Sequence, residues 1–376
     1  MKIAVVSPHL PSPALPMRGV RHDEQLRGFA AAGHDVRAVV PVAWSPRTRA
    51  VPAEEHDGGV TVVHPRYLRP PSLPLERLLF ARAAAPALPA WPDVVLAHSA
   101  TLPGGLLGRI GRAPLVVALH DHELFELAPR SAVLRALLAR TLRGAACAVY
   151  VSETLRREGE RLAGAHRAVV IPIGIAVCAE PMAAPPAIFT VCVVARLVRR
   201  KRIDRVIRAV ARLRNEGVPD ARIEVIGDGP ERAALANLGD TLRVPVAMTG
   251  ALDARGAQER IARASVLALP SVMESLGAVY LEAMALGVPA LGTRGEGIAA
   301  HLEHGVSGLL VPPDDDERLY QELRALAADP ARARAIGAEG KRRFEAGRWA
   351  WADNVAAYLA IFAELVRHGA RATHTT

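Results

Sequence analysis

The fold and chemistry of this chain are indicated most clearly by residues 266–285, VLALPSVMESLGAVYLEAMA. The apolar run at 266–269 ends at Pro270 and is typical of a buried strand in a parallel sheet. A run of good helix formers starts near Leu276 and stops at Gly287. A strand, a short loop and a helix N-terminus together predict an anion-binding site, because the first N–H groups of a helix lack partners within it.

Two carboxylates belong to this stretch. Glu274 lies in the loop and Glu282 follows eight residues later, which is roughly 12 Å if the whole span were helical. That distance suits a molecule with a sugar at one end, a ribose at the other and phosphates between them. Two carboxylates at this spacing are by themselves typical of a solvated helix face. Glu274, however, comes directly after a buried strand, which favours a binding site.

The pattern Pro-Ser-x-x-Glu-Ser-Leu-Gly-x4-Glu-Ala-Met-Ala at 270–285 resembles the Glu-x7-Glu signature of family 4 retaining glycosyltransferases. The resemblance implies an α/β chain with two Rossmann-like domains facing each other across a cleft, the GT-B fold. It also implies transfer of a hexose-type sugar from a nucleoside-diphosphate sugar to an acceptor hydroxyl, with no metal and no cofactor. In that interpretation Glu274 is catalytic, and the donor is bound by Glu274, Ser275, Leu276, Gly277 and Glu282.

The rest of the chain alternates short apolar strands with helical stretches, which indicates parallel sheets covered by helices. We expect strands at 3–6, 36–40, 60–64, 94–97, 115–119, 148–151, 169–171, 189–194, 223–226, 246–248, 266–269, 290–292 and 308–311. We expect helices at 23–32, 131–142, 153–162, 203–215, 231–238, 257–264, 276–286 and from about 315.

Length and proline content predict the domain organisation. With 376 residues, two domains are the default. Residues 1–175 form the predicted acceptor domain, 176–187 a proline-containing linker, and 188–348 the donor domain. The final predicted helix, in 349–376, either crosses back to the first domain, as the resemblance implies, or completes the second.

A cationic loop follows the first strand of the second half. Arg196 and Lys201 match the Arg and Lys of the related motif Gly-Arg-Leu-x-x-x-Lys-Gly, which implies that they bind the donor diphosphate. Cations there stabilise the charge that develops on the leaving group. Ala195 and Arg202 stand where that motif has glycine. The turn at 227–230, Gly-Asp-Gly-Pro, resembles a further family turn, for which we expect a supporting role.

The first half carries weaker signals. His120 follows a predicted strand and matches a family histidine that contacts the donor sugar, so we expect it to be catalytic. A metal site at His120, His122 and Glu123 is an alternative, but no further ligands are evident. Gly19 matches a glycine loop that approaches the donor phosphate. We expect the acidic run at 314–316 to begin a helix and not to bind metal.

Composition limits the partners. The net charge is +9 and the isoelectric point about 10.1, yet no nucleic-acid motif accompanies the charge, so we expect no nucleic-acid partner. Three widely spaced cysteines and an N-terminus without a signal peptide predict a cytoplasmic location. Residues 73–90 combine leucines with arginines. We expect them in the core, with peripheral contact at the inner face of the membrane as the alternative.

Two other functions stay open at this stage. A sugar-nucleotide epimerase or hydrolase can use the same fold, and acceptor-independent turnover would identify it. A catalytically inactive donor-binding subunit is the other, because Asp121, Ile173 and Ala195 depart from the family pattern. The acceptor is not readable from the motifs, and envelope glycans, lipids and secondary metabolites all fit.

Overall fold

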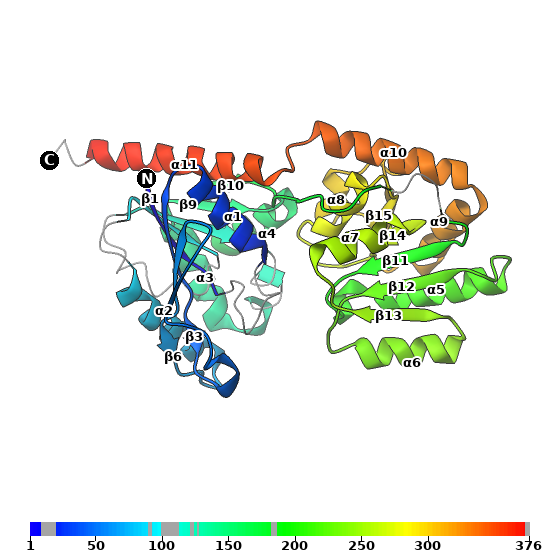
Figure 1. Ribbon diagram of the computed structural model, residues 1–376, viewed down its shortest axis with the longest axis horizontal. Coiled ribbons are helices and arrows are strands. Elements are labelled where there is room, and N and C mark those ends of the chain that lie inside the picture. The colour runs from blue at the N-terminus through cyan, green and yellow to red at the C-terminus, as the bar shows by residue number, and fades with distance from the viewer. Residues whose placement is uncertain are drawn as a thin grey trace. The chain divides into compact units, whose positions relative to one another are not determined.

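The computed structural model describes residues 1–8, 20–88, 92–98, 113–120, 124–125, 128–181 and 186–372. The chain divides into two compact units, residues 1–174 with 349–376, and residues 175–348. Each unit holds a largely parallel sheet with helices packed around it (Figure 1). The expected α/β class with two Rossmann-like domains is therefore confirmed.

The main sheet of the first unit has, in the described residues, eight strands in the order β10-β9-β8-β7-β1-β2-β5-β4. Their bounds are β1 (Lys2–Val6), β2 (Asp35–Val39), β4 (Glu54–Asp57), β5 (Val60–Val63), β7 (Val94–Ala97), β8 (Leu115–Leu119), β9 (Cys147–Tyr150) and β10 (Ala168–Val170). All pair in parallel except β4, which is antiparallel to β5. The expected strands agree to within one residue at each end. β4 was not expected, because an exposed edge strand carries no apolar alternation.

A smaller two-stranded sheet pairs β3 (Val42–Ala43) with β6 (Arg66–Tyr67). The helices of this unit are α1 (Val20–Ala31), α2 (Leu73–Ala87), α3 (Ala132–Gly144), α4 (Glu153–Ala163) and α11 (Trp351–Ala372), with the 3-10 turns η1 (Pro46–Thr48) and η4 (Ala128–Arg130). Within α2, Phe80 is buried as expected of a core helix, but Leu75 and Leu78 are 44% and 58% exposed. The core interpretation is therefore wrong for these two leucines.

Helix α11 lies against α1 (Figure 1). Phe29 of α1 packs on the rings of Tyr358 and Phe362, with centroids 6.2 and 5.6 Å away. The two helices approach closely because Gly28 has no side chain: a Cβ there would lie 2.5 Å from Val355. The last helix is thus part of the hydrophobic core of the first unit.

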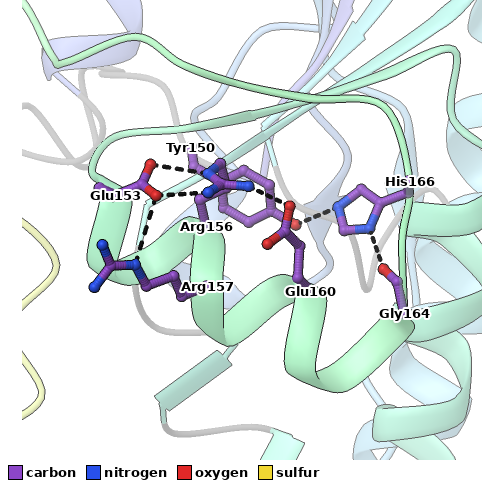
Figure 2. A network of polar contacts seen from close by, with 7 residues as sticks. All are labelled: Tyr150, Glu153, Arg156, Arg157, Glu160, Gly164 and His166. Carbon is purple, nitrogen blue, oxygen red and sulfur yellow. Dashed lines mark hydrogen bonds and ion pairs between the residues drawn. The ribbon is translucent and has the colours of Figure 1, made fainter.

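Helix α4 shows how polar groups are satisfied after a buried strand. Ser152 caps the helix, its hydroxyl accepting from the Leu155 amide at 3.2 Å. Arg156 forms ion pairs with Glu153 and Glu160 on the same helix (Figure 2). Beyond the helix, His166 receives a hydrogen bond from the Tyr150 hydroxyl at 2.7 Å (Figure 2).

The second unit contains a fully parallel sheet in the order β13-β12-β11-β14-β15-β16. Its strands are β11 (Thr190–Val194), β12 (Arg222–Ile226), β13 (Val246–Gly250), β14 (Val266–Ala268), β15 (Ala290–Thr293) and β16 (Leu309–Val311). The helices are α5 (Ile203–Asn215), α6 (Arg232–Leu242), α7 (Ala254–Ala262), α8 (Ala278–Ala285), α9 (Asp316–Ala328) and α10 (Pro330–Ala346), with the 3-10 turns η5 (Arg199–Lys201) and η6 (Gly297–Ala300).

Caps explain two helix boundaries in this unit. Helix α7 starts three residues earlier than expected because Asp253 accepts the Gly256 amide at 2.8 Å. Asp315 caps α9 in the same way, which confirms the acidic run at 314–316 as a helix start. None of the helices in the described part of the chain is both long and apolar enough to cross a bilayer.

Candidate functional site

The second sheet has a topological switch point between β11 and β14. From β11 the chain continues to β12 on one side, and it later returns with β14 on the other side of β11. In open parallel sheets ligands bind beyond the carboxyl ends of the strands at such a point. The loops at 195–202 and 269–277 both begin there, so the sheet brings the cationic and acidic motifs together.

The best-defined contact in these loops is an ion pair between the Lys201 ammonium and Glu274 Oε2. Both side chains are nearly buried, with 11% and 5% of their surface exposed. The backbone holds the pair in place, since the Val272 amide donates to Arg200 O at 2.9 Å and the Arg200 guanidinium donates to Met273 O at 2.9 Å. Two residues singled out from the sequence are therefore in direct contact.

Helix α8 begins two residues later than expected, because Gly277 adopts φ +71° and serves as its N-cap. A Cβ at Gly277 would lie 2.3 Å from the ring of Tyr280, which is itself buried. Ser275 and Leu276 are buried in the turn before the helix, and Glu282 on α8 is only 8% exposed. The structure thus has a helix N-terminus, small-residue amides and two buried carboxylates in one strand–loop–helix unit.

Sequence reasoning gave no role to Glu296, although it lies at the centre of the neighbouring loop. Its carboxylate accepts the amides of Met273 and Glu274 at 3.0 and 2.6 Å. Burial raises the pKa of Glu296, and the two amide hydrogen bonds oppose that rise. Glu296 therefore fixes the backbone of the loop that carries Glu274.

The glycines on either side of Glu296 were the one feature of the sequence that could have indicated the importance of this loop. Gly297 lies so close to the Glu274 loop that a Cβ there would be 1.7 Å from Ser275 O. Its amide also donates to Glu274 O at 3.1 Å. Gly295, in contrast, adopts φ +86° and has open space around it.

The other glycine turn supports the cationic loop. A Cβ at Gly227 would lie 1.9 Å from Ala195 O, and one at Gly229 would lie 2.4 Å from Leu197 O. The Leu197 amide donates to Asp228 O at 2.9 Å. The loop is anchored by this backbone contact and by buried Leu197, while Arg196 projects to the surface. Arg196 is therefore exposed at the same sheet edge as Lys201.

Arg202 adopts φ +53°, a left-handed conformation, where the related motif has glycine. Its guanidinium lies 3.2 Å from Asp314, which also has a positive φ of 57°. Where the motif has glycine, this chain therefore places an arginine in a strained, left-handed conformation.

In the first unit, His120 follows β8 and His98 follows the adjacent strand β7. His22, on α1, faces both. His98 Nδ1 is 3.3 Å from His120 Nε2, and His22 Nδ1 is 3.1 Å from the hydroxyl of Ser7, which follows β1. Since β7 and β1 flank the switch point of this sheet, the cluster occupies the place where that unit would bind a ligand. The expected candidates Gly19, His122 and Glu123 lie outside the described residues, as does Asp121, which departs from the family pattern.

The three histidine rings are packed together. The rings of His22 and His98 are stacked, with centroids 4.1 Å apart and planes 14° apart. His120 lies edge to edge with His98, with centroids 5.5 Å apart and planes 18° apart, and its ring is tilted by 30° to that of His22. Their ligand atoms lie within 4.8 Å of one another, so the group has the composition of a metal site. However, the lone pair of an imidazole lies in the plane of its ring, and the stacked planes of His22 and His98 do not converge on one ion. The arrangement fits stacking and hydrogen bonding better than ligation.

Burial, with the neighbouring histidines adding to it, holds the pKa of His98 well below its usual value. His98 is 3% exposed and therefore stays neutral at physiological pH. A pocket of this unit opens beside the cluster and is lined by His22, Gln25, His98, His120, Val151, Ile171, Ile173, Trp351, Asn354 and Tyr358. Helix α11 completes it, since Asn354 Oδ1 accepts from the Gln25 amide at 2.6 Å and the Asn354 amide donates to Pro172 O at 2.7 Å.

Two family models match the chain, "Glycosyl transferases group 1" over residues 183–343 and "Glycosyltransferase Family 4" over residues 20–177. A curated relative from Mycolicibacterium smegmatis, the GDP-mannose-dependent alpha-(1-6)-phosphatidylinositol monomannoside mannosyltransferase, is 31% identical over 66% of this chain and 69% of its own length. Matches to similar mannosyltransferases of Corynebacterium glutamicum and Mycobacterium tuberculosis span less than half of those proteins.

Solved structures agree with this match at the level of the fold. Sucrose-phosphate synthase of Thermosynechococcus elongatus superposes with a TM-score of 0.84 at 20% identity, covering 98% of this chain and 100% of that one. HepE of Anabaena in complex with UDP-glucose gives a TM-score of 0.72 at 19% identity, covering 96% and 99%.

Proposed function

The chain belongs to the group 1 glycosyl transferases with the GT-B fold, and from this premise we propose that it is a retaining, metal-independent hexosyltransferase. The donor is a nucleoside-diphosphate sugar and the acceptor nucleophile is a hydroxyl group. The observation that carries the proposal is the buried Lys201–Glu274 pair beside the N-terminus of α8.

Each residue of the second unit has a role that follows from its chemistry. Arg196 and Lys201 bind the diphosphate, together with the amides at 275–277, because the helix N-terminus and the cations stabilise negative charge. The carboxylate of Glu282 accepts hydrogen bonds from the ribose hydroxyls. Glu274 accepts hydrogen bonds from hydroxyl groups of the sugar. Its carboxylate is already oriented by the ion pair with Lys201 and by the hydrogen bonds that its loop donates to Glu296. In the first unit, we propose that His120 contacts the sugar during transfer.

The reaction replaces one bond at the anomeric carbon by another on the same face. The acceptor oxygen bonds to that carbon as the bond to the leaving phosphate breaks, and the phosphate oxygen takes the acceptor proton. The positive charges of Arg196 and Lys201 offset the charge that develops on the nucleoside diphosphate. This route keeps the anomeric configuration without requiring a nucleophilic carboxylate.

The direct test is product analysis. GDP-mannose and UDP-glucose are the first donors to try, because the M. smegmatis relative is named for the former and the Anabaena structure contains the latter. The proposal predicts nucleoside-diphosphate release that depends on an acceptor and an α-linked product from an α-linked donor. Inverted product would contradict retention. Release without acceptor would indicate a hydrolase, and an epimeric donor would indicate an epimerase.

We further propose that the first unit rests on an anionic membrane surface on the cytoplasmic side. Exposed apolar side chains lie directly after β3 and β6 and on α2. These three elements are neighbours in Figure 1. Trp44, Leu68, Leu75 and Leu78 are 65%, 73%, 44% and 58% exposed, and we call them the apolar surface. Trp44 follows β3 and its amide donates to Tyr67 O at 2.9 Å, which places it beside Leu68.

Positive charge accompanies the apolar surface along the chain. Exposed arginines in the same segments are Arg49, Arg66 and Arg82. The exposed Arg69 is paired with the buried Glu76 of α2 at 3.1 Å and adds no net charge. Arg82 shares the exposed face of α2 with the two leucines, because positions 75, 78 and 82 are three and four residues apart. Exposed leucines and a tryptophan beside arginines suit a bilayer that contains anionic lipid. The three free cysteines agree with a reducing compartment.

Vesicle sedimentation tests this contact. We expect the protein to bind vesicles that contain phosphatidylglycerol, with weaker binding to pure phosphatidylcholine and at high salt. The double variant Leu75→Ser/Leu78→Ser should lose binding. Val133→Ser, which changes an equally exposed valine on α3, should retain it. Equal sedimentation of all three proteins, or none by the wild type, would contradict the proposal.

A further inference from the structure

We propose that buried His98 is a positioning residue that holds His120 in the tautomer protonated on Nδ1, so that His120 is neutral and donates from Nδ1. The assignment of the tautomer follows from the cluster alone. Its consequence for sugar binding rests on the proposed function.

The argument starts from the hydrogen bonds of His98. Its Nδ1 lies 3.3 Å from His120 Nε2, and its Nε2 has no hydrogen-bond partner in the described structure. A neutral imidazole carries one proton, and His98 is neutral because it is buried. The proton is therefore on Nδ1 or on Nε2.

The two choices are not equivalent. A proton on Nε2 would leave a buried N–H donor without an acceptor, which proteins avoid more strictly than an unpaired lone pair. A proton on Nδ1 of His98 is donated to His120. That choice satisfies the donor and leaves only the lone pair of Nε2 unpaired.

The tautomer of His120 follows. Its Nε2 accepts from His98, so it cannot also carry a proton, and the single proton of the neutral ring is on Nδ1. Protonation of His120 at Nε2 would place two N–H groups against each other. The ring of His22, tilted by 30° with its centroid 4.8 Å from that of His120, adds a third imidazole, which further disfavours a positive charge there.

A neutral His120 suits glycosyl transfer. Positive charge develops at the anomeric carbon as the bond to the leaving phosphate breaks, and an imidazolium nearby would oppose it. A neutral Nδ1–H can donate to a sugar hydroxyl without that cost.

His166 provides an internal reference in the same unit. Its Nδ1 faces the carbonyl of Gly164 at 2.8 Å, and a carbonyl only accepts (Figure 2). Its proton is therefore on Nδ1, and Nε2 accepts from Tyr150. The His166 signal should show the pattern of an Nδ1–H tautomer in every variant.

The experiment is a long-range ¹H–¹⁵N correlation spectrum of the full chain labelled with ¹⁵N-histidine, with His120 assigned from His120→Gln. We expect the Nδ1–H pattern for His120 in the wild type. His98→Leu removes the donor and should give a mixture of tautomers or a protonated ring near neutral pH. His98→Asn places an amide N–H near the position of Nδ1 and should restore the wild-type pattern.

An Nε2–H or protonated His120 in the wild type would overturn the inference, as would an unchanged pattern in His98→Leu. The wild-type spectrum decides the matter even if His98→Leu does not fold. Donor affinity gives the second readout: we expect it to fall about tenfold in His98→Leu, the loss of roughly one hydrogen bond, and to recover in His98→Asn. If the wild type binds no donor while His120 shows the Nδ1–H pattern, the proposed function fails and the tautomer assignment stands.

Discussion

Replacing Lys201 by methionine would leave the carboxylate of Glu274 without its cation. With only 5% of that side chain exposed, the pair counts as desolvated, and removing one partner of a buried ion pair costs about 3–5 kcal/mol. For a unit of about 174 residues, each kcal/mol shifts the melting temperature by about 2–4 °C. The melting temperature of the second unit should therefore fall by about 6–20 °C in Lys201→Met.

The double variant Lys201→Met/Glu274→Gln removes both charges and keeps the shape of both side chains. We expect it to recover most of the loss, which gives a coupling energy of about 2–3 kcal/mol in a double-mutant cycle. Lys341→Met is the matched control, because Lys341 forms an exposed pair with Glu345 at 3.9 Å in the same unit. That substitution should cost less than about 0.5 kcal/mol.

Scanning calorimetry and far-UV circular dichroism measure the loss of stability in the second unit. All four tryptophans occupy positions 1–174 or 349–376, so their fluorescence reports separately on the first unit and provides a further control. A loss below about 1 kcal/mol for Lys201→Met would match an exposed pair and would refute the reasoning.

Three further predictions concern the backbone and the histidines. Gly297→Ala places a Cβ 1.7 Å from Ser275 O and should abolish donor binding, whereas Gly295→Ala, which meets no atom but has φ +86°, should cost about 1 kcal/mol of stability and leave binding intact. Equal donor affinities of the two variants in titration calorimetry would contradict this. Arg202→Gly should be more stable than Arg202→Ala by about 1 kcal/mol in chemical denaturation, since φ is +53°; a more stable alanine variant would argue against strain. Because the pKa of His98 is lowered on folding, the unfolded chain binds the extra proton, so stability should fall as pH drops below about 6.5, by up to about 1.4 kcal/mol per unit. In His98→Leu, the slope of the free energy of unfolding against pH should decrease by the equivalent of one bound proton, as measured by denaturation followed through tryptophan fluorescence. An unchanged slope would show that His98 is charged in the folded state.

Much of the fold is readable from the sequence because each central strand is an apolar run that stops at a polar or proline residue. The edge strand β4 cannot be read from the sequence, because its side chains are charged and mostly exposed. Helix α8 begins later than its composition suggests because the left-handed turn at Gly277 depends on the contact with Tyr280.

The site was only partly predictable for a similar reason. Glu274 and Lys201 are separated by 73 residues, yet both follow strands that meet at one sheet edge, so the topology was enough to bring them together. The role of Glu296 depends on which amides its carboxylate reaches, and no local pattern specifies that.

The histidine cluster combines residues from two strand ends and a helix. His98 follows β7 as His120 follows β8, which was a usable signal in the sequence. The orientation of the rings and the burial of His98 come from packing alone.

The central claim is that the strand–loop–helix unit at 266–285 binds a nucleoside-diphosphate sugar, and donor binding without added metal tests it most directly. Thermal shift and titration calorimetry with a panel of nucleoside-diphosphate sugars should show stabilisation of the wild type by one donor through mass action. In Glu282→Ala that stabilisation should be lost, while the unliganded variant stays folded. Stabilisation of both proteins to the same extent, or of neither by any donor in the panel, would contradict the account.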